Sequence, residues 1–403
     1  MSVLSGKKIL LGISGGIAAY KTASLVRLFI KAGAHVRVVM TPASKDFITP
    51  LTLSTLSKNP VYSSFYNEED ENAVWNNHVE LGLWADFFVI APATANTLSK
   101  MVSGNADNLL IATYLSAKCP VYFAPAMDLD MYRHPSTTDS FDKLQAFGNS
   151  IIPAESGELA SGLHGEGRMA EPEHIIAFIE KDIEGKLPLR GKKVLITAGP
   201  TYEPIDPVRF IGNYSTGKMG YDIAAEAAAQ GAEVVLISGP THLQLPAGNI
   251  TAVNVVSSQQ MYEACHAHFD NADVVIAAAA VADYRPAVVA TQKIKKNEPG
   301  LMLELEKTKD ILASLGERKK NQFLIGFALE TENEIEHARQ KIKKKNLDLI
   351  VLNSLNDEGA GFGKPTNKVT FIDSQFNEEP MELKTKEAVA KDIINKIKKH
   401  YNV

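Results

Sequence analysis

Cysteine is scarce in this sequence, and long hydrophobic runs are missing from it. The two cysteines among the 403 residues, Cys119 and Cys265, are too few for a disulfide framework and suggest no zinc site. The apolar run at residues 9–13 breaks at the glycines that follow, too soon for the core of a signal peptide. No segment reaches the roughly 20 apolar residues of a membrane-spanning helix. We therefore expect a protein of the reducing cytoplasm, with no membrane partner and no metal site built from its own side chains.

An excess of basic charge is also absent, because 42 Lys and Arg face 47 Asp and Glu, for a net charge of -5. This balance disfavours a nucleic-acid partner bound through a basic surface. Hydrophobic residues make up 45% and charged residues 22%, as in ordinary globular proteins. The length exceeds that of one ordinary domain, so we expect two.

Apolar, β-branched runs alternate with helical patterns in the first half. The runs occupy residues 8–13, 35–40, 87–90 and 121–123, and a helical pattern covers 18–31. Buried runs separated by helices predict a parallel sheet with crossover connections, and hence an α/β fold.

The same pattern restarts in the second half, where residues 191–196 repeat the Gly-Lys-Lys start of 6–10. The charged segment 180–190 contains a proline and predicts a linker. We therefore predict two doubly wound, Rossmann-like parallel-sheet domains, residues 1–189 and 190–403.

The buried run 273–276 is followed by small residues, then by Asp283, then by lysines at 293–296. Small residues let a flat ring approach the backbone, an acid can accept hydrogen bonds from the ring's donor groups, and lysines can bind phosphates. This combination predicts a nucleotide pocket at the carboxyl end of a parallel strand.

The first half lacks the G-x-G-x-x-G dinucleotide fingerprint, because Ser14 stands where the second glycine belongs. Gly15 and Gly16 still allow backbone N–H groups to reach a phosphate at a helix start. Taken alone, a mononucleotide phosphate site and a plain tight turn remain open. Residues 91–97 likewise suit a flat ring and a phosphate, or an N-capped helix start.

Four motifs of the first half occur in order: SGGIAAYK at 14–21, the run 91–97, PAM at 125–127 and GEGRM at 165–169. Together they resemble the homo-oligomeric flavin-containing cysteine decarboxylases. With the second half included, the whole chain resembles the bacterial bifunctional phosphopantothenoylcysteine decarboxylase / phosphopantothenate–cysteine ligases of coenzyme A biosynthesis. The resemblance rests on the joint presence and order of the motifs.

For the first domain the resemblance implies FMN-dependent decarboxylation, in which the substrate's thiol is oxidised, CO₂ leaves and the product is reduced back. His78 matches the family's catalytic histidine, and an imidazole can take the proton lost as the thiol is oxidised. The implied flavin-binding residues are Ser14, Gly15, Gly16, Ala93, Thr94 and Asn96.

Two catalytic positions depart from the family pattern. Asp128 replaces an asparagine implied to bind the substrate carboxylate, which an aspartate repels unless it is protonated or paired, for example with Arg133. Ser161 replaces a cysteine implied to supply a proton, and a hydroxyl is a far weaker acid than a thiol. His164 is the nearest other donor. The reaction could use Ser161 or another donor, run slowly, or be lost and leave a ligase only; we expect an active decarboxylase.

Residues 212–219 nearly match a P-loop, but Met219 replaces the Mg²⁺-binding hydroxyl and no buried strand precedes the motif. The segment instead resembles the ligase motif. There the resemblance implies that Asn213 and Arg209 handle the acyl-cytidylate intermediate and its carboxylate, because an arginine fork neutralises two anions.

The implied ligase reaction joins 4′-phosphopantothenate to L-cysteine with CTP, releasing pyrophosphate and then CMP, with Mg²⁺ neutralising the triphosphate. The choice of CTP over ATP rests on the resemblance. Lys341 and Lys345 fall on one face of an expected helix, which composition alone would leave solvated. The implied nucleotide contacts are Ala277, Ala278, Ala279, Asp283, Lys293, Lys309, Asp310, Ile311, Leu312, Phe327, Lys341 and Lys345.

The resemblance also implies a homo-oligomer of flavin-domain trimers and ligase-domain dimers, up to a dodecamer, with the FMN site near a subunit contact. Other flavin enzymes, such as peptide cysteine decarboxylases or flavin prenyltransferases, lack the second domain. A nucleotide-binding regulator without activity fits poorly with the charged residues expected at both pockets.

Overall fold

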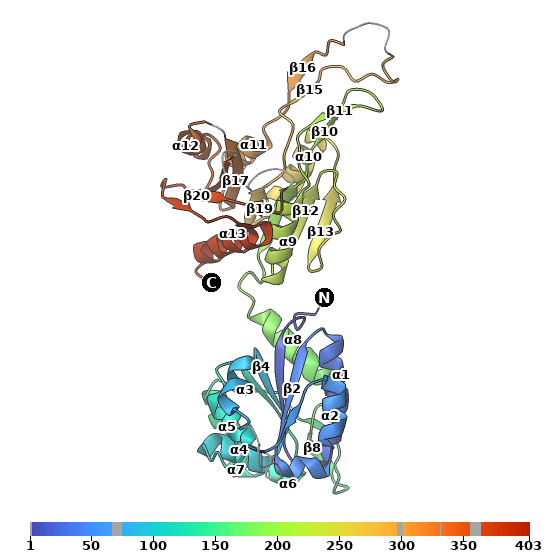
Figure 1. The fold of residues 1–403 in the computed structure, drawn as a ribbon, viewed down its shortest axis with the longest axis vertical. Coiled ribbons are helices and arrows are strands. Elements are labelled where there is room, and N and C mark those ends of the chain that lie inside the picture. The colour runs from blue at the N-terminus through green and yellow to red at the C-terminus, as the bar shows by residue number, and fades with distance from the viewer. Residues whose placement is uncertain (1, 67–74, 296–300, 331, 355–363) are drawn as a thin grey trace. The chain divides into compact units, whose positions relative to one another are not determined.

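The computed structural model describes residues 2–66, 75–295, 301–330, 332–354 and 364–403. The chain forms two compact units, Met1–Gly185 and Lys186–Val403, and each has a central sheet flanked by helices (Figure 1).

The first unit has one six-stranded sheet in the order β3-β2-β1-β4-β5-β6, and every pairing in it is parallel. The order reverses between β1 and β4, so the loops after these two strands open at the same edge. The expected strands at 8–13 and 35–40 form with those bounds. The strands are β1 Lys8–Ile13, β2 His35–Met40, β3 Val61–Tyr62, β4 Phe87–Ala93, β5 Val121–Pro125 and β6 Ser150–Ile151.

Helices cover both faces of this sheet, and a separate hairpin of β7 Glu155–Glu158 and β8 His164–Arg168 follows β6. The helix expected over 18–31 is divided, because the Thr22 hydroxyl donates to the Ala19 carbonyl at 2.6 Å and closes a 3₁₀ turn. The helical elements are η1 Ile17–Lys21, α1 Thr22–Lys31, η2 Pro42–Asp46, α2 Pro50–Ser57, α3 His78–Trp84, α4 Ala95–Ser103, α5 Leu109–Ser116, α6 Leu129–Arg133, α7 Pro135–Ala146 and α8 Pro172–Gly185.

The segment expected to be a linker is partly helical. Residues 180–185 form the end of α8, because Ile175 and Ile179 lie one turn apart and are fully buried in the first unit's core. Leu189, where we place the domain boundary, is buried in the core of the second unit.

The second unit has an eight-stranded sheet in the order β13-β12-β9-β14-β17-β18-β20-β21. Its first six strands pair in parallel and reverse order between β9 and β14. The last two are antiparallel, since residues 374–377 join them by a tight turn instead of a crossover. The strands are β9 Lys193–Ala198, β12 Glu233–Ser238, β13 Ile250–Asn254, β14 Val274–Ala277, β17 Phe323–Glu330, β18 Leu349–Ser354, β20 Val369–Asp373 and β21 Glu378–Pro380.

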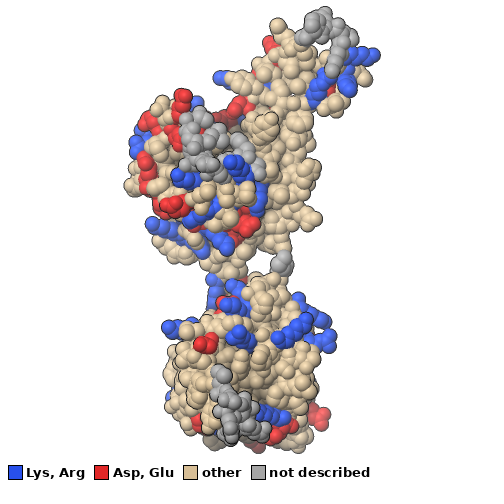
Figure 2. Space-filling view, in the orientation of Figure 1, with Lys and Arg blue, Asp and Glu red and all other residues tan. Residues whose placement is uncertain are grey.

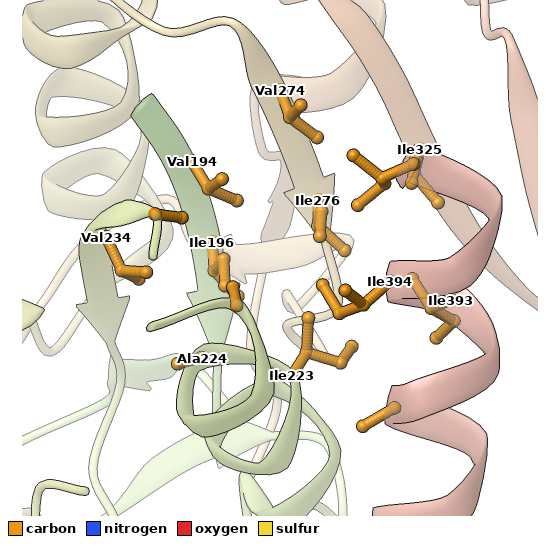
Figure 3. Close-up of a cluster of buried hydrophobic side chains, with 14 of the residues drawn as sticks. Val194, Ile196, Ile223, Ala224, Val234, Val274, Ile276, Ile325, Ile393 and Ile394 are labelled. Atoms are coloured by element: carbon orange, nitrogen blue, oxygen red, sulfur yellow. The ribbon is translucent and has the colours of Figure 1, made fainter. Parts of the chain in front are cut away.

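One face of this sheet is covered by α9 Lys218–Ala229 and α13 Lys386–Tyr401, whose Ile223, Ile393 and Ile394 pack against the strands (Figure 3). Three helices cover the other face: α10 Ser258–Phe269, α11 Ile311–Arg318 and α12 Glu334–Lys344. Three small hairpins complete the unit: β10 Tyr202–Pro204 with β11 Phe210–Gly212, β15 Tyr284–Pro286 with β16 Leu305–Lys307, and β19 Thr366–Asn367 with β22 Lys384–Thr385.

The surface around α12 and β21 carries basic and acidic side chains side by side (Figure 2), and several of them pair, such as Arg339 with Glu378 at 2.8 Å. Within the described residues, no helix combines the length and the apolar character that crossing a membrane requires.

Replacing Ile394 with alanine tests the packing of α13 on the sheet. The side chain is 0% exposed, so we expect Ile394→Ala to lower the free energy of unfolding of the second unit by about 2–5 kcal/mol. Val288→Ala, at a side chain 81% exposed, should change it by less than about 0.5 kcal/mol. Urea unfolding of both variants measures the difference, and equal effects would contradict this packing.

Candidate functional site

A cavity opens in each unit where the strand order of its sheet reverses. In the first unit the loops after β1 and β4 line it, and in the second unit the loop after β14 does. Ligands of open α/β sheets bind at this position, because loops from neighbouring strands diverge there.

The loop after β1 is held against the loop after β4 by one buried hydroxyl. Ser14 is 1% exposed; its Oγ donates to the Pro92 carbonyl at 2.7 Å and accepts from the Thr94 N–H at 3.0 Å. The serine that breaks the dinucleotide fingerprint therefore joins the two loops of the candidate site.

The first cavity has a volume of about 340 Å³ and small or amide-bearing walls. Gly15, Thr94 and Asn96 line it as the sequence suggests, while Ala93 lies fully buried at the end of β4. Thr94 also caps α4, with its Oγ1 accepting from the Thr97 N–H. Residues 91–97 therefore start a capped helix and line the cavity at the same time. Ala126 and Met127 of the PAM motif also line it, while sequence reasoning missed Thr41, Ala43, Asn108 and Met131.

Two of these missed residues carried a signal in the sequence. Thr41 directly follows β2, one of the strands that end at this edge. Asn108 precedes α5 and caps it, accepting from the Ile111 N–H at 3.2 Å. Polar residues that end strands or start helices at the switch point were therefore the pattern to look for.

A second hollow of about 490 Å³ lies beside Ala126 and Met127, and Gly16, Lys21, Asp128 and Ala160 also line it. Gly167, in β8, forms part of its wall with φ +130, and a Cβ there would lie 2.4 Å from the Met127 carbonyl. Only glycine fits such a position, so the hairpin can approach the Met127 loop closely.

Asp128 caps α6 through the Leu129 N–H at 2.6 Å. Arg133, the example of a pairing cation, forms no ion pair with it within the part of the chain that the structure describes. Ser161 and His164 both lie exposed at the tip of the β7–β8 hairpin, where Leu159 and Ala160 line the hollow but Ser161 and His164 do not.

His78 lines neither cavity. It is the first residue of α3, its ring meets Phe65 edge-on at 6.1 Å, and its Nδ1 is buried without a hydrogen-bond partner among the described residues. The structure therefore leaves this imidazole away from the cavities of its own chain, with a nitrogen free to bond.

The base of the β7–β8 hairpin is held by charges. Lys21 is 6% exposed, and its Nζ donates to the Met169 carbonyl and to Glu171, both at 3.0 Å. Arg168 reaches the same Glu171 oxygen at 2.7 Å. The hydrogen bond from Lys21, against a smaller opposing effect of burial, lowers the pKa of Glu171.

The cavity of the second unit has a volume of about 580 Å³. Asn213, Ala278, Ala279, Asp283 and Phe327 line it as the resemblance suggests, but Ala277 does not. Asn213 is held by its Nδ2, which donates to the Val281 carbonyl at 2.8 Å. The cavity walls that sequence reasoning missed are Tyr214, Ser215, Gly217, Lys218, Leu329, Asn353, Asn367 and Lys386.

The near P-loop does not lie on a strand of the central sheet. Residues 212–219 connect β11, which belongs to a small antiparallel hairpin, to the start of α9 at Lys218. A true P-loop joins a strand of the parallel sheet to its helix, so the structure agrees with rejecting that motif.

Arg209 lies outside this cavity, on the turn between β10 and β11. Its guanidinium binds Asp206 at 3.1 Å and the Ile294 carbonyl at 3.3 Å, which places it beside the exposed Lys293. Burial raises the pKa of Asp206, but hydrogen bonds from three backbone N–H groups and the charge of Arg209 outweigh it and lower the pKa. Lys296, part of the same expected lysine cluster, lies outside the described residues.

The other expected phosphate lysines also lie outside the cavity. Lys341 pairs with Glu330, and Lys345 pairs with Asp310 at 3.0 Å. Asp310 itself caps α11, so its carboxylate serves the helix and the lysine at once. Lys309 lies over the Tyr262 ring at 4.7 Å, Ile311 is buried in the core, and Leu312 packs against that core.

Two largely parallel sheets, each with a cavity at its switch point, place the chain in the class of two-domain, doubly wound α/β proteins. A family model described as Flavoprotein matches residues 2–184, and one described as DNA/pantothenate metabolism flavoprotein C-terminal domain matches residues 189–401. Coenzyme A biosynthesis bifunctional protein CoaBC of Bacillus subtilis (strain 168) is 44% identical over 397 residues, 98% of this chain and 97% of that protein. The chain therefore belongs to the family of coenzyme A biosynthesis bifunctional proteins, and it is a bifunctional ligase and carboxy-lyase, which confirms the family predicted from the motifs.

Two further similarities were found. A Cysteine/Cysteine sulfinic acid decarboxylase from an unknown prokaryotic organism is 55% identical over 355 residues, covering 87% of this chain and 98% of that protein. A crystal structure of the C-terminal domain of a CoaBC protein is 46% identical, covers 54% of this chain and 99% of that chain, and superposes with a TM-score of 0.47.

Replacing Ser14 with alanine tests the joint between the two loops. The change leaves the Thr94 N–H without a partner and the Pro92 carbonyl with the Ser14 N–H alone, at 3.3 Å, so we expect a loss of about 1–3 kcal/mol in stability and a lower flavin content. The ratio of visible flavin absorbance to protein absorbance measures the content. Ser103→Ala, at an exposed hydroxyl at the end of α4, is the control and should keep the flavin.

His174 gives a pH test of the hairpin base, where its Nδ1 meets Glu155 at 2.6 Å. The hydrogen bond and charge of Glu155 raise the pKa of His174 above its ordinary 6.5. The pair therefore supports the fold below that ordinary value and stops doing so as pH rises through the raised pKa. An NMR titration should show the raised value in the wild type and a return toward 6.5 in Glu155→Gln; an unshifted wild type would contradict the pairing.

Proposed function

We propose that the first unit binds FMN and decarboxylates phosphopantothenoylcysteine, and that the second unit makes this substrate from 4′-phosphopantothenate, L-cysteine and CTP with Mg²⁺. The observation that carries the proposal is the pair of switch-point cavities, one in each family-matched unit.

The first cavity fits a flavin nucleotide in three respects. A Cβ on Gly15 would lie 2.8 Å from the Ala43 Cβ, so glycine there lets the two segments pack closely where both line the cavity. Thr41 lines the cavity and has a buried Oγ1 without a partner among the described residues, a group that a ligand oxygen can satisfy. Asn96 and Asn108 add amide groups to the same wall. When bound, FMN supplies reversible two-electron redox chemistry.

His78 is the proposed base for the substrate thiol. It lies away from its own chain's cavities, so we propose that it acts in a homo-oligomer, at the cavity of a neighbouring subunit. Its unpartnered Nδ1 supports this, because a buried imidazole nitrogen needs a hydrogen-bond partner. The proton for the last reduction comes from the exposed tip of the β7–β8 hairpin, where Ser161 and His164 are the two candidates.

In the second unit, Asn213 and the backbone of Ala278 and Ala279 hold the activated acid and the nucleotide. Arg209 is the proposed clamp on the developing acyl phosphate, and because it lies outside its own cavity we propose that it too acts across a subunit contact, in a dimer. Among the described residues no cluster of three or more His, Cys, Asp or Glu forms a metal site. We propose that Mg²⁺ enters with the triphosphate, whose charge it neutralises.

Mass spectrometry of the products tests both activities. Purified protein given 4′-phosphopantothenate, L-cysteine, CTP and Mg²⁺ should accumulate 4′-phosphopantetheine, with CMP and pyrophosphate. A stop at phosphopantothenoylcysteine would show a ligase with an inactive flavin unit, and no new thiol product would refute the proposal.

Decarboxylation of free cysteine or cysteine sulfinic acid is a second candidate for the first unit. The relative of 55% identity carries that name. Asp128 also favours it, since free cysteine has an ammonium group that a carboxylate attracts, whereas phosphopantothenoylcysteine has a neutral amide in its place.

Asp128→Asn separates the two substrates. Removing the charge should lower KM for phosphopantothenoylcysteine and raise it for free cysteine, each by about 1 kcal/mol or roughly fivefold. Asparagine caps α6 as well as aspartate does, so thermal stability should stay the same and serves as the control. If KM for both substrates moves in the same direction, Asp128 does not interact with the ammonium group of free cysteine.

A further inference from the structure

The second unit's cavity contains a buried lysine that the described residues do not neutralise. Lys386 is the first residue of α13, is 7% exposed and lines the cavity. None of the described residues forms an ion pair with its ammonium within 4.0 Å or a hydrogen bond with it. Burial lowers its pKa. A buried unpaired cation is costly to a fold, so its retention calls for a partner that arrives from outside.

Of the neighbouring charged groups, Lys218 is bonded to two carboxylates, while the second oxygen of Asp222 is buried without a hydrogen-bond partner among the described residues. Lys218, at the start of α9, binds Asp222 at 2.9 Å and Glu387 at 3.2 Å. Asp222 acts on Lys386 through its charge from beyond ion-pair distance. Lys218 therefore pairs with two carboxylates, whereas Lys386 pairs with none among the described residues. The ammonium of Lys386 is thus available to bind a ligand in the cavity.

A second polar side chain in the same wall is also incompletely bonded. Asn367 is 4% exposed and lines the cavity; its Nδ2 donates to the Asn353 Oδ1 at 3.1 Å, while its Oδ1 is buried with no partner in the described part of the chain. Buried polar atoms are satisfied in almost all native structures. A ligand group in the cavity can supply the missing bond.

The α9 N-terminus adds a third feature to this wall. Gly217 caps the helix with φ +82 and without a side-chain hydrogen bond, and both Gly217 and Met219 line the cavity. The first N–H groups and the dipole of a twelve-residue helix favour an anion at that end. The side chain of Lys386 and the N-terminus of α9 therefore line the same cavity.

The helices that carry these groups are firmly placed. Ile393 and Ile394 of α13 and Ile223 of α9 are fully buried and pack on the same face of the sheet (Figure 3). The first residue of α13 is therefore held beside the first turn of α9 before any ligand binds, and little ordering is needed when one does.

We propose that Lys386 binds a phosphate group of the ligand in this cavity and is a binding residue of the ligase reaction. The inference rests on the proposed ligase function and deepens it. The phosphate belongs either to the nucleotide or to the phosphorylated acid, since both carry one. Of the phosphate-binding lysines expected from the sequence, Lys341 and Lys345 are paired with carboxylates outside the cavity, and Lys293 lies exposed outside it.

The full-length protein with Lys386→Met tests the proposal by calorimetric titration. Binding should weaken by about tenfold or more, because a hydrogen bond between charged groups is lost. If the nucleotide supplies the phosphate, CTP and pyrophosphate should bind more weakly and cytidine should not change. If the acid supplies it, 4′-phosphopantothenate should bind more weakly and pantothenate should not change.

The thermal transition of the free protein separates this role from a structural one. Lys386→Met removes a buried charge and keeps the side-chain length, so the Tm of the second unit should rise. Lys384→Met is the matched control: its Nζ pairs with Asp392 at 2.7 Å, so the variant should lose stability and keep ligand affinity. A lower Tm in Lys386→Met, or unchanged affinity for all five ligands, would overturn the proposal. Failure of the wild type to form product would instead refute the ligase function itself.

Discussion

Parallel pairing between the two central strands of each sheet is the constraint on which both sites depend. β1 with β4, and β9 with β14, run side by side in the same direction, so each must be followed by a crossover helix. Because the crossovers leave to opposite sides of the reversal point, the loops part and a cavity remains between them. The buried residues of the sheet thereby determine where ligands bind, even though they touch none of them.

The strands and the loops that follow them were readable from the sequence, because the information is local. β1 and β2 have the expected bounds, and Gly15, Thr94 and Asn96 line the cavity that follows β1 and β4. A buried strand shows itself in a short apolar run, and the loop after it shows its small and polar residues. No tertiary contact is needed to see either feature.

Charged groups were less predictable, because their partners come from distant parts of the chain. The helical spacing of Lys341 and Lys345 says nothing of Glu330 and Asp310, which take up their charges. Lys386 gave no signal, since the residues that share its cavity wall, such as Gly217 and Lys218, come from a distant part of the chain. His78 and Arg209 lie outside the cavities of their own chain, and the sequence around them gives no sign of this.

The lysine at the end of η1 links two parts of the flavin unit mechanically. Lys21 belongs to the 3₁₀ turn that follows Gly15 and Gly16, and its ammonium grips the strand end at Met169 and Glu171. One ammonium therefore connects the turn to the end of the hairpin through two hydrogen bonds. We expect a displacement of the turn to be passed to the hairpin through these bonds.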